Sequence, residues 1–382
     1  MLSCGEASGE LYAAALAREL RALAPGTRIV ALGGALLRDA GVELLADYHG
    51  ISVTGLTEAL RVVPRSLALI RALGDAADRV KPDVFVPIDF PDFNFRLMAA
   101  MARRGVPVVY YISPQLWAWR AGRMRTMKRL VSKVLVIFPF EERLYLDAGV
   151  DAEFVGHPLV DLATPSADRA TLRARFGAAG DEPLIALLPG SRRNELRAIL
   201  PDMARAAALI SGRLPSAKFV LARAPRLHDD LFAPVGALMP GVRVAMADSA
   251  ADDVLAASDV VITASGTATV QAALHERAMV IVYRVSPVTE MLGRLFVKLD
   301  TFGMVNLVAG ERVVPELVQD QFTPGAVADE VVSLVTDRAR RDAMVAKLRE
   351  VKTKLGGKGG ARRAAEAILR SVAAAKGATL AP

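Results

Sequence analysis

The sequence predicts an α/β protein with two domains, each built on a parallel β-sheet that helices cover on both faces. Three observations support this fold class. The chain has 382 residues, which exceeds what one ordinary hydrophobic core encloses. Short runs rich in β-branched residues alternate with longer segments of helical period. A turn-rich segment at 156–168 separates two such series, and we place a hinge there.

The alternation predicts strands in both halves of the chain. In the first half they are 28–32, 83–88, 106–112, 134–137 and 153–155. In the second half they are 184–188, 218–221, 242–245, 260–263 and 280–283. We therefore expect Rossmann-like domains at 1–160 and 161–345, with C-terminal helices at 346–382. A glycine-rich break at 356–360 permits the last helix to return to the first domain or to swap into a partner chain, so an oligomer is possible.

Composition excludes several classes of protein. Cys4 is the single cysteine, so there is no disulfide framework, and the N-terminus lacks the features of a signal peptide. No uncharged apolar run approaches the ~18 residues of a membrane span, and we expect a cytoplasmic protein. The net charge of +7 suits nucleic acid, an anionic membrane surface or an anionic substrate. The basic stretches 120–133 and 338–363 lack the recurrent aromatic residues of a single-strand-binding surface, so we expect no nucleic acid.

The clearest chemical feature is the loop that follows the expected strand 184–188. Gly190, Ser191 and Arg192 lead from this strand into a helix rich in Ala and Leu. A helix N-terminus offers unpaired N–H groups and a positive dipole, and an arginine can bind an anion with two hydrogen bonds. This combination indicates a phosphate site. The alternative is an ordinary helix cap, in which Glu195 extends back to the loop.

A second loop of small residues follows the expected strand 260–263. It contains Ser265, Gly266, Thr267 and Ala268 and precedes another Ala-rich helix. Two such loops in one sheet can face one crevice, where they would hold a pyrophosphate, although simple helix capping is the alternative. Neither loop is a Walker A or a G-x-G-x-x-G motif, so ATPase and NAD-dependent functions lack their main sequence support.

Two carboxylates follow a strand of the first half. Asp89 and Asp92 come directly after 83–88, where either can accept a proton from an attacking hydroxyl or merely cap the next helix. The four histidines are far apart in sequence and there is no Asp-x-Asp pair, so we expect no metal site. Arg192 and the helix dipoles would then neutralise the charge of a leaving group.

The segment 56–73 is more apolar than a solvated surface should be. Arginines flank an apolar stripe, which favours a membrane interface or contact with an acyl chain. A core helix kinked at Pro64 is the alternative. The expected contact residues are Leu56, Leu60, Val63, Leu67, Ile70 and Leu73.

Together these motifs resemble the lipid-A-disaccharide synthase family, bacterial glycosyltransferases of the GT-B fold in which two Rossmann-like domains face each other across a cleft. The similar segments are 5–10, 89–94, 113–120, 155–158, 188–192, 265–268 and 306–310. The resemblance implies inverting transfer of diacylglucosamine from UDP-diacylglucosamine to diacylglucosamine phosphate, giving the lipid A disaccharide phosphate and UDP without a cofactor. Both substrates are acylated and anionic, which implies peripheral association with the inner membrane.

The resemblance also implies roles for individual residues. Asp92 is the expected general base, with Asp89 second. The expected ligands of the UDP-sugar are Gly190, Ser191, Arg192, Ser265, Gly266, Thr267, Ala268, Asn306, Glu316 and Gln319. Those of the acceptor are Ser8, Gly9 and Glu10.

The chain departs from the family pattern at two positions, with Glu10 where an aspartate is usual and Gln271 where a glutamate commonly binds ribose. Three other functions remain open on the residues alone. A UDP-N-acetylglucosamine epimerase or a peptidoglycan-type transferase would share the phosphate loops. A non-catalytic lipid-binding protein would use only the apolar and basic surface.

Overall fold

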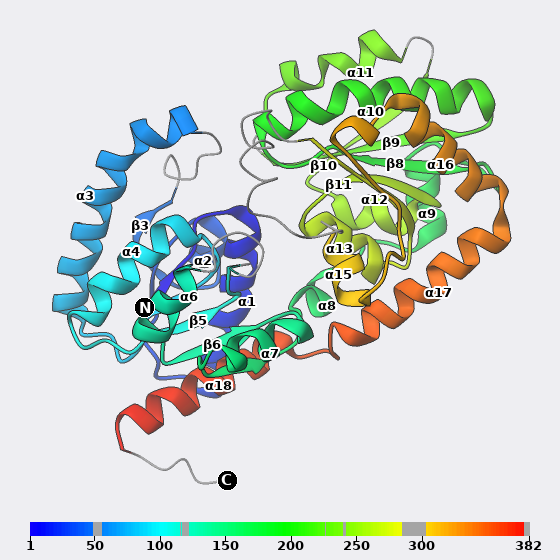
Figure 1. The fold of residues 1–382 in the computed structure, drawn as a ribbon. Coiled ribbons are helices and arrows are strands. Elements are labelled where there is room, and N and C mark those ends of the chain that lie inside the picture. Colours follow the sequence, from blue (N-terminus) through cyan, green and yellow to red (C-terminus); the bar gives the residue numbers. More distant parts are fainter. Residues whose placement is uncertain are drawn as a thin grey trace. The chain divides into compact units, whose positions relative to one another are not determined.

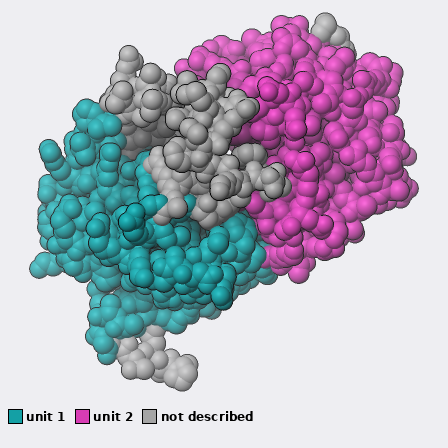
Figure 2. Space-filling view, viewed as in Figure 1, with its two compact units in different colours: residues 1–158, 355–382 teal, residues 159–354 magenta. Residues whose placement is uncertain are grey.

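A computed structural model describes residues 1–48, 56–114, 116, 122–225, 227–239, 242–284 and 303–377, with only the helical backbone given for 56–62 (Figure 1). The chain divides into two compact units (Figure 2). Unit 1 comprises Met1–Pro158 and Leu355–Pro382, and unit 2 comprises Leu159–Lys354. The first boundary lies close to the expected one. The second differs, because residues 346–354, which we grouped with the C-terminal helices, belong to unit 2.

Unit 1 is built on parallel strands. One sheet has the order β3-β2-β1-β4, a second has the order β5-β6-β7, and the parallel bridges Phe85–Val108 and Ile88–Tyr111 join β4 to β5. The strands are β1 (Leu2–Ser3), β2 (Val30–Gly33), β3 (Glu43–Asp47), β4 (Val86–Pro87), β5 (Val109–Tyr111), β6 (Lys133–Val136) and β7 (Ala152–Phe154). Most of these strands are buried, as parallel sheets covered on both faces require. The central β1 and the edge strand β3 were not predicted.

The helices of unit 1 include the last one of the chain. They are α1 (Ala7–Leu23), α2 (Ala35–Asp39), α3 (Leu56–Val80), α4 (Pro91–Ala102), α6 (Gly122–Leu130), α7 (Pro139–Asp147) and α18 (Gly360–Ala375). The buried face of α18 consists of small residues with Ile368, and it packs against α1 (Figure 1). Within this chain α18 therefore returns to the first unit, one of the two arrangements that the glycine-rich break permits.

Within unit 1, the segment that ends at Pro158 is bonded to the segment that begins at Leu355. The N–H of His157 donates to the carbonyl of Leu355 at 2.9 Å. Gly356 has φ +88, and a Cβ there would lie 3.2 Å from the Cα of Gly156, so this close approach requires glycine. The Arg363 guanidinium donates to three carbonyl oxygens, those of Val155 at 2.8 Å, Lys358 at 2.7 Å and Gly357 at 2.9 Å.

Unit 2 contains one parallel sheet of order β10-β9-β8-β11-β12-β13. Its strands are β8 (Leu184–Leu188), β9 (Lys218–Arg223), β10 (Val244–Asp248), β11 (Val260–Ala264), β12 (Ala278–Tyr283) and β13 (Glu316–Val318). The strand order reverses direction between β8 and β11, as in a Rossmann fold. The five expected strands are present within a few residues, and β13 was not predicted.

Helices surround this sheet. They are α8 (Leu159–Leu162), α9 (Arg169–Arg175), α10 (Arg193–Arg213), η1 (Asp229–Phe232), α11 (Ala233–Leu238), α12 (Ala251–Ala257), α13 (Thr267–Leu274), α15 (Met304–Ala309), η2 (Gln319–Gln321), α16 (Pro324–Thr336) and α17 (Arg338–Lys354). α10 packs against α16, and α13 and α15 pack against α17. Each unit therefore encloses its own core, as the length of the chain predicts.

Candidate functional site

The two glycine-containing loops of unit 2 are neighbours at the carboxyl edge of the sheet. β8 and β11 are adjacent, and their register pairs Leu188 with Thr263. The loop that begins at Pro189 therefore emerges beside the loop that begins at Ser265. Because the strand order reverses between β8 and β11, both loops lie at the position where doubly wound sheets bind nucleotides. The sequence predicted this proximity.

The first loop is shaped by glycine and closed by a carboxylate. Gly190 has φ +110, a conformation that favours glycine. Glu195 accepts hydrogen bonds from the N–H groups of Ser191 at 3.2 Å and Arg192 at 3.3 Å. Its other oxygen forms an ion pair with the Arg192 guanidinium at 3.1 Å. The helix cap that we gave as the alternative is thus present in this structure. It uses the same N–H and guanidinium donors that we assigned to phosphate.

The second loop leaves the start of α13 open. Gly266 is the N-cap residue with φ +147, and a Cβ there would meet nothing within 4 Å. The carbonyl of Gly266 accepts from the hydroxyl of Thr269 at 2.8 Å, which fixes the first turn. Gly266 and Thr267 are exposed, while Ser265 and Ala268 are half-buried. This loop can offer backbone N–H groups to an anion without a bulky side chain in the way.

Gln271 has a structural partner on a neighbouring helix. Its amide donates to the Asp252 carboxylate at 3.2 Å, and the same oxygen contacts Nε2 of His275 at 2.9 Å. A glutamate at position 271 would place two carboxylates against each other. Asp252 therefore suits a glutamine at position 271, where the family commonly has a glutamate.

Asn306 and Glu316, which we expected to contact the donor sugar, are buried in a hydrogen-bond network. The Asn306 side-chain oxygen accepts from the N–H groups of Val313 at 2.8 Å and Val314 at 3.0 Å. Its amide nitrogen donates to Glu316 at 2.6 Å, and Glu316 also accepts from the N–H of Gly303 at 3.0 Å. In this structure both residues brace the chain between α15 and β13. Gln319 follows β13 directly and has φ +53.

In unit 1, a second pair of loops meets at the carboxyl edge of the sheet. β1 and β4 are adjacent, and a Cβ on Gly5 would lie 2.2 Å from the ring of Phe90, so the loops after these strands are in contact. Asp89 and Phe90 have φ +48 and +52, unusual values for residues other than glycine. Strain of this kind persists only where the surroundings impose it, often at functional sites.

Buried hydrogen bonds hold the strained turn. Asn94 is fully buried and donates to the carbonyl of Asp89 at 2.7 Å, while its oxygen accepts from the Ser3 hydroxyl at 2.7 Å. The hydroxyl of Tyr110 donates to the same Asp89 carbonyl at 2.8 Å. These partners fix the direction in which the first turn of α4 leaves the sheet.

Asp92 lies in that first turn, and its side chain is 74% exposed. Its carboxylate forms an ion pair with Arg123 at 2.5 Å, and the Arg123 guanidinium stacks over the ring of Phe95 at 4.8 Å. The N-cap residue of α4 is Phe90, which makes no side-chain cap. Asp92 therefore lies at the surface, with its carboxylate paired to Arg123.

Glu10 is buried, which corrects its expected contact with the acceptor. Its carboxylate accepts from the N–H of Leu36 at 2.8 Å and from the hydroxyl of Tyr48 at 2.9 Å. Glu10 thus provides a hydrogen-bond acceptor for an N–H group in the first turn of α2. Gly9 is also buried, whereas Ser8 is half-buried in the first turn of α1. Of the three expected acceptor residues, only Ser8 presents surface.

The apolar stripe on α3 divides between core and surface. Leu73 is 1% exposed and belongs to the core of unit 1, which corrects its assignment as a membrane contact. Ile70 packs partly against this core, Val63 is half-buried and Leu67 is 41% exposed. The side chains of Leu56 and Leu60 fall outside the described part of the structure, as does most of the segment 115–121.

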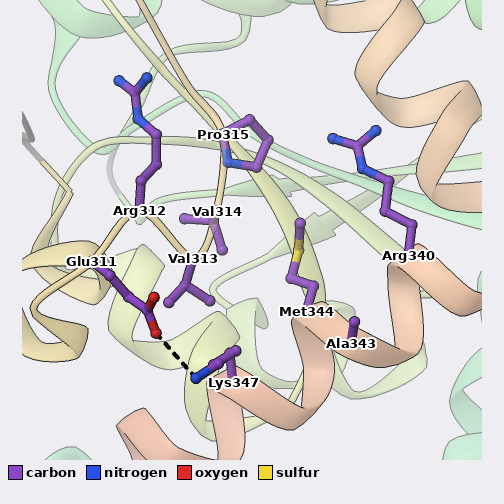
Figure 3. Close-up of a pocket in the computed structure, with 9 residues that line it drawn as sticks. All are labelled: Glu311, Arg312, Val313, Val314, Pro315, Arg340, Ala343, Met344 and Lys347. Atoms are coloured by element: carbon purple, nitrogen blue, oxygen red, sulfur yellow. Dashed lines mark ion pairs between the residues drawn. The ribbon is translucent and has the colours of Figure 1, made fainter.

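A hollow of about 400 Å³ lies beside the start of β13 in unit 2 (Figure 3). Its lining includes Pro315, which directly precedes β13, and Met344 and Lys347 of α17. The register pairs Glu316 with Ile281 and Ile281 with Thr263, so the start of β13 is level with the carboxyl end of β11. None of its lining residues belongs to either glycine-containing loop.

The residues that the structure describes contain no group of three His, Cys, Asp or Glu side chains placed to hold a metal ion. Within the same ranges, no helix has the length and apolar composition that a membrane crossing requires.

His157, at the end of unit 1, is fully buried among aromatic rings. Its ring centroid lies 6.0 Å from that of Tyr12 and 5.3 Å from that of Phe138. Burial lowers the pKa of His157 to about 3, so the imidazole is neutral near pH 7. His157 is thus a neutral side chain in the interior of unit 1.

Solved structures share this fold. The Neisseria meningitidis UDP-GlcNAc 2-epimerase bound to UDP-GlcNAc superposes with a TM-score of 0.69 at 13% identity, over 97% of this chain and 98% of that one. The Anabaena protein HepE in complex with UDP and glucose gives a TM-score of 0.61 at 15% identity, over 97% and 99%. These likenesses support the GT-B fold class expected from the sequence.

Sequence relatives are much more similar. The family described as lipid-A-disaccharide synthetase matches residues 1–372. The lipid-A-disaccharide synthase of Myxococcus xanthus is 45% identical over 371 residues, which cover 97% of this chain and 96% of the relative. That of Koribacter versatilis is 44% identical over 374 residues, with 97% of each covered. The chain therefore belongs to the lipid-A-disaccharide synthase family, glycosyltransferases of lipid A biosynthesis, rather than to the epimerases or to non-catalytic lipid-binding proteins.

Proposed function

We propose that this chain transfers diacylglucosamine from UDP-diacylglucosamine to diacylglucosamine phosphate, with inversion at the anomeric carbon and release of UDP. The observation that carries the proposal is the pairing of two glycine-containing loops at the carboxyl ends of β8 and β11, in a member of this family. Inversion follows from a single displacement, in which the acceptor hydroxyl attacks the anomeric carbon as the bond to UDP breaks.

Unit 2 would bind the donor. The N–H groups of the loops at Gly190–Arg192 and Ser265–Ala268 would donate hydrogen bonds to the two phosphates, and the Arg192 guanidinium would offset the charge that grows on UDP as it leaves. Gln319, at the carboxyl end of β13, would complete the donor side. Asn306 and Glu316 would act on this site through the loop that they brace.

Unit 1 would bind the acceptor and supply the base. Asp92 would take the proton from the attacking hydroxyl, and the ion pair with Arg123 would hold its carboxylate in one orientation. Asp89 is the second candidate. Ser8 would contribute a hydroxyl at the same edge of the sheet, because α1 and α4 start after the adjacent strands β1 and β4.

The surface of α3 would meet the lipid part of the substrates. Leu67 and Val63 leave apolar area accessible beside the exposed Arg65 and Arg71. Apolar side chains flanked by arginines suit the interface of an anionic membrane. We propose peripheral association with the cytoplasmic face of the inner membrane through this segment.

Incubation with UDP-diacylglucosamine and diacylglucosamine phosphate, with and without EDTA, tests the proposal. We expect stoichiometric release of UDP and disaccharide phosphate, with equal rates in both conditions. The absence of UDP release would contradict the transferase assignment, and inhibition by EDTA would contradict a metal-independent mechanism. Exchange of UDP-N-acetylglucosamine with its 2-epimer would instead favour an epimerase.

A further inference from the structure

The Glu195 carboxylate lies where the proposed donor phosphate should bind. Its Oε2 accepts from the N–H groups of Ser191 at 3.2 Å and Arg192 at 3.3 Å, and its Oε1 contacts the Arg192 guanidinium at 3.1 Å. These donors lie at the entrance to α10, where an incoming anion would find them. An anion therefore already occupies this loop, and the chain itself supplies it.

The carboxylate also covers the face of the loop that glycine leaves bare. A Cβ on Gly190 would lie 2.7 Å from Oε2 of Glu195, so the carboxylate fills the space beside that residue. Carboxylate and phosphate oxygens accept from the same donors, and two anions at this distance repel each other. Glu195 and a phosphate group cannot use the loop together.

Glu195 is able to move away. It lies in the first turn of α10, with exposed Arg193 and Asn194 beside it, and its own side chain is 18% exposed. The helix backbone is anchored by the buried Leu196 and Ile199 that follow. A change of side-chain rotamer can thus open the loop without displacement of the helix.

We infer that Glu195 is an internal competitor for the donor phosphate: it occupies the loop in the nucleotide-free protein and is displaced when UDP or the UDP-sugar binds. This inference rests on the proposed function. In the free protein the carboxylate keeps Arg192 and the loop in their binding geometry, which makes Glu195 a positioning residue. The free energy needed to displace the Glu195 carboxylate weakens nucleotide binding. Return of the carboxylate to the loop favours release of the product UDP.

The substitution Glu195→Gln tests the inference, because it removes the charge and keeps the shape. A neutral amide competes less well for N–H groups and a guanidinium than a carboxylate does. From the usual strength of charged hydrogen bonds, discounted for partial exposure, we expect the Kd for UDP to fall about five- to twentyfold. The Kd for uridine, which carries no phosphate, should stay unchanged. Isothermal titration measures both.

Thermal unfolding gives a readout independent of activity. Without ligand, the Glu195→Gln variant should unfold at a lower temperature than the wild type, because the helix loses its charged cap. Saturating UDP should remove this difference, since Glu195 makes no contact with the loop in the complex. Asp168→Asn is the matched control: Asp168 caps α9 of the same unit by accepting from the N–H of Thr171 at 3.0 Å. This control should lower the unfolding temperature equally with and without UDP and leave the Kd unchanged.

The outcomes separate this inference from the function on which it rests. A Kd for UDP that is unchanged or weaker in Glu195→Gln overturns the competitor role, and a weaker Kd would make Glu195 a ligand of the nucleotide. Equal tightening of uridine and UDP also overturns it, because the effect would not depend on phosphate. If neither the wild type nor the variant binds UDP, the nucleotide assignment itself fails.

Discussion

Arg363 joins the chain segments at the two unit boundaries, and its removal should destabilise unit 1 measurably. Its guanidinium donates to three carbonyl oxygens at 2.7–2.9 Å, from Val155 on one segment and from Gly357 and Lys358 on the other. Fully buried hydrogen bonds from a charged donor contribute about 1.5–3 kcal/mol each, but Arg363 is half-buried and water can replace part of each bond. The bond to Val155 is partly buried, while those to Lys358 and Gly357 are exposed. At about 0.5–1 kcal/mol for the first and a few tenths of a kcal/mol for each of the others, Arg363→Ala should lower the free energy of unfolding by roughly 1–2 kcal/mol.

Urea denaturation followed by circular dichroism, together with hydrogen exchange of residues 153–158 and 355–376, measures this loss. Arg362→Ala is the matched control on the same helix. Arg362 forms an ion pair with Glu366 four residues later, a surface contact worth about 0.3–0.5 kcal/mol. Arg363→Lys should be intermediate, because an ammonium group cannot reproduce the planar set of donors. If Arg363→Ala costs no more than Arg362→Ala, the bond to Val155 does not hold the two segments together.

Three further predictions concern the proposed site and the buried histidine. Asp92→Asn should lower turnover by roughly two to four orders of magnitude with the Kd for UDP unchanged, and wild-type turnover would remove Asp92 from the mechanism. Gly190→Ala adds a Cβ 2.7 Å from Glu195 at φ +110, and should weaken UDP binding at least about tenfold by distorting the loop. Gly177→Ala, with φ +81 and open space, is its control and should lose stability but not UDP affinity. The pKa of His157 is lowered to about 3, so the unfolded chain binds the proton first as pH falls, and stability is lost between about pH 6.5 and 3. His157→Gln should flatten this pH dependence by up to about 1.4 kcal/mol per pH unit, and an unchanged slope in urea titrations would contradict the assignment.

The order of strands and the loops after them followed largely from local patterns. Buried parallel strands are short and apolar, so Leu184–Leu188 and Val260–Ala264 were visible as such in the sequence. β1 and β13 were missed because two or three residues carry too little periodicity to detect. β1 nevertheless lies at the centre of its sheet, and its place there sets Asp92 and Ser8 at the same edge.

Residue types alone did not distinguish charged groups that bind ligands from those that brace the fold. Glu10 and Glu316 resemble site residues in the sequence, but both are buried and satisfied by groups 10 to 38 residues away. Leu73 shares its helical stripe with Leu67, yet one is in the core and the other is exposed. Helical periodicity gives the direction of a side chain, and only its neighbours decide whether solvent covers it.

The sequence by itself determined the fold class, the two glycine-containing loops and the family, because these depend on short contiguous patterns of glycine, charge and apolar period. Tertiary structure decided which residues those loops meet. It brought the loops after β8 and β11 together through strand order, and it placed Glu195 on the donors of Arg192 and Ser191. The physical reason is that hydrogen bonds and ion pairs depend on distances within a few ångströms, which the order of residues along a chain does not specify.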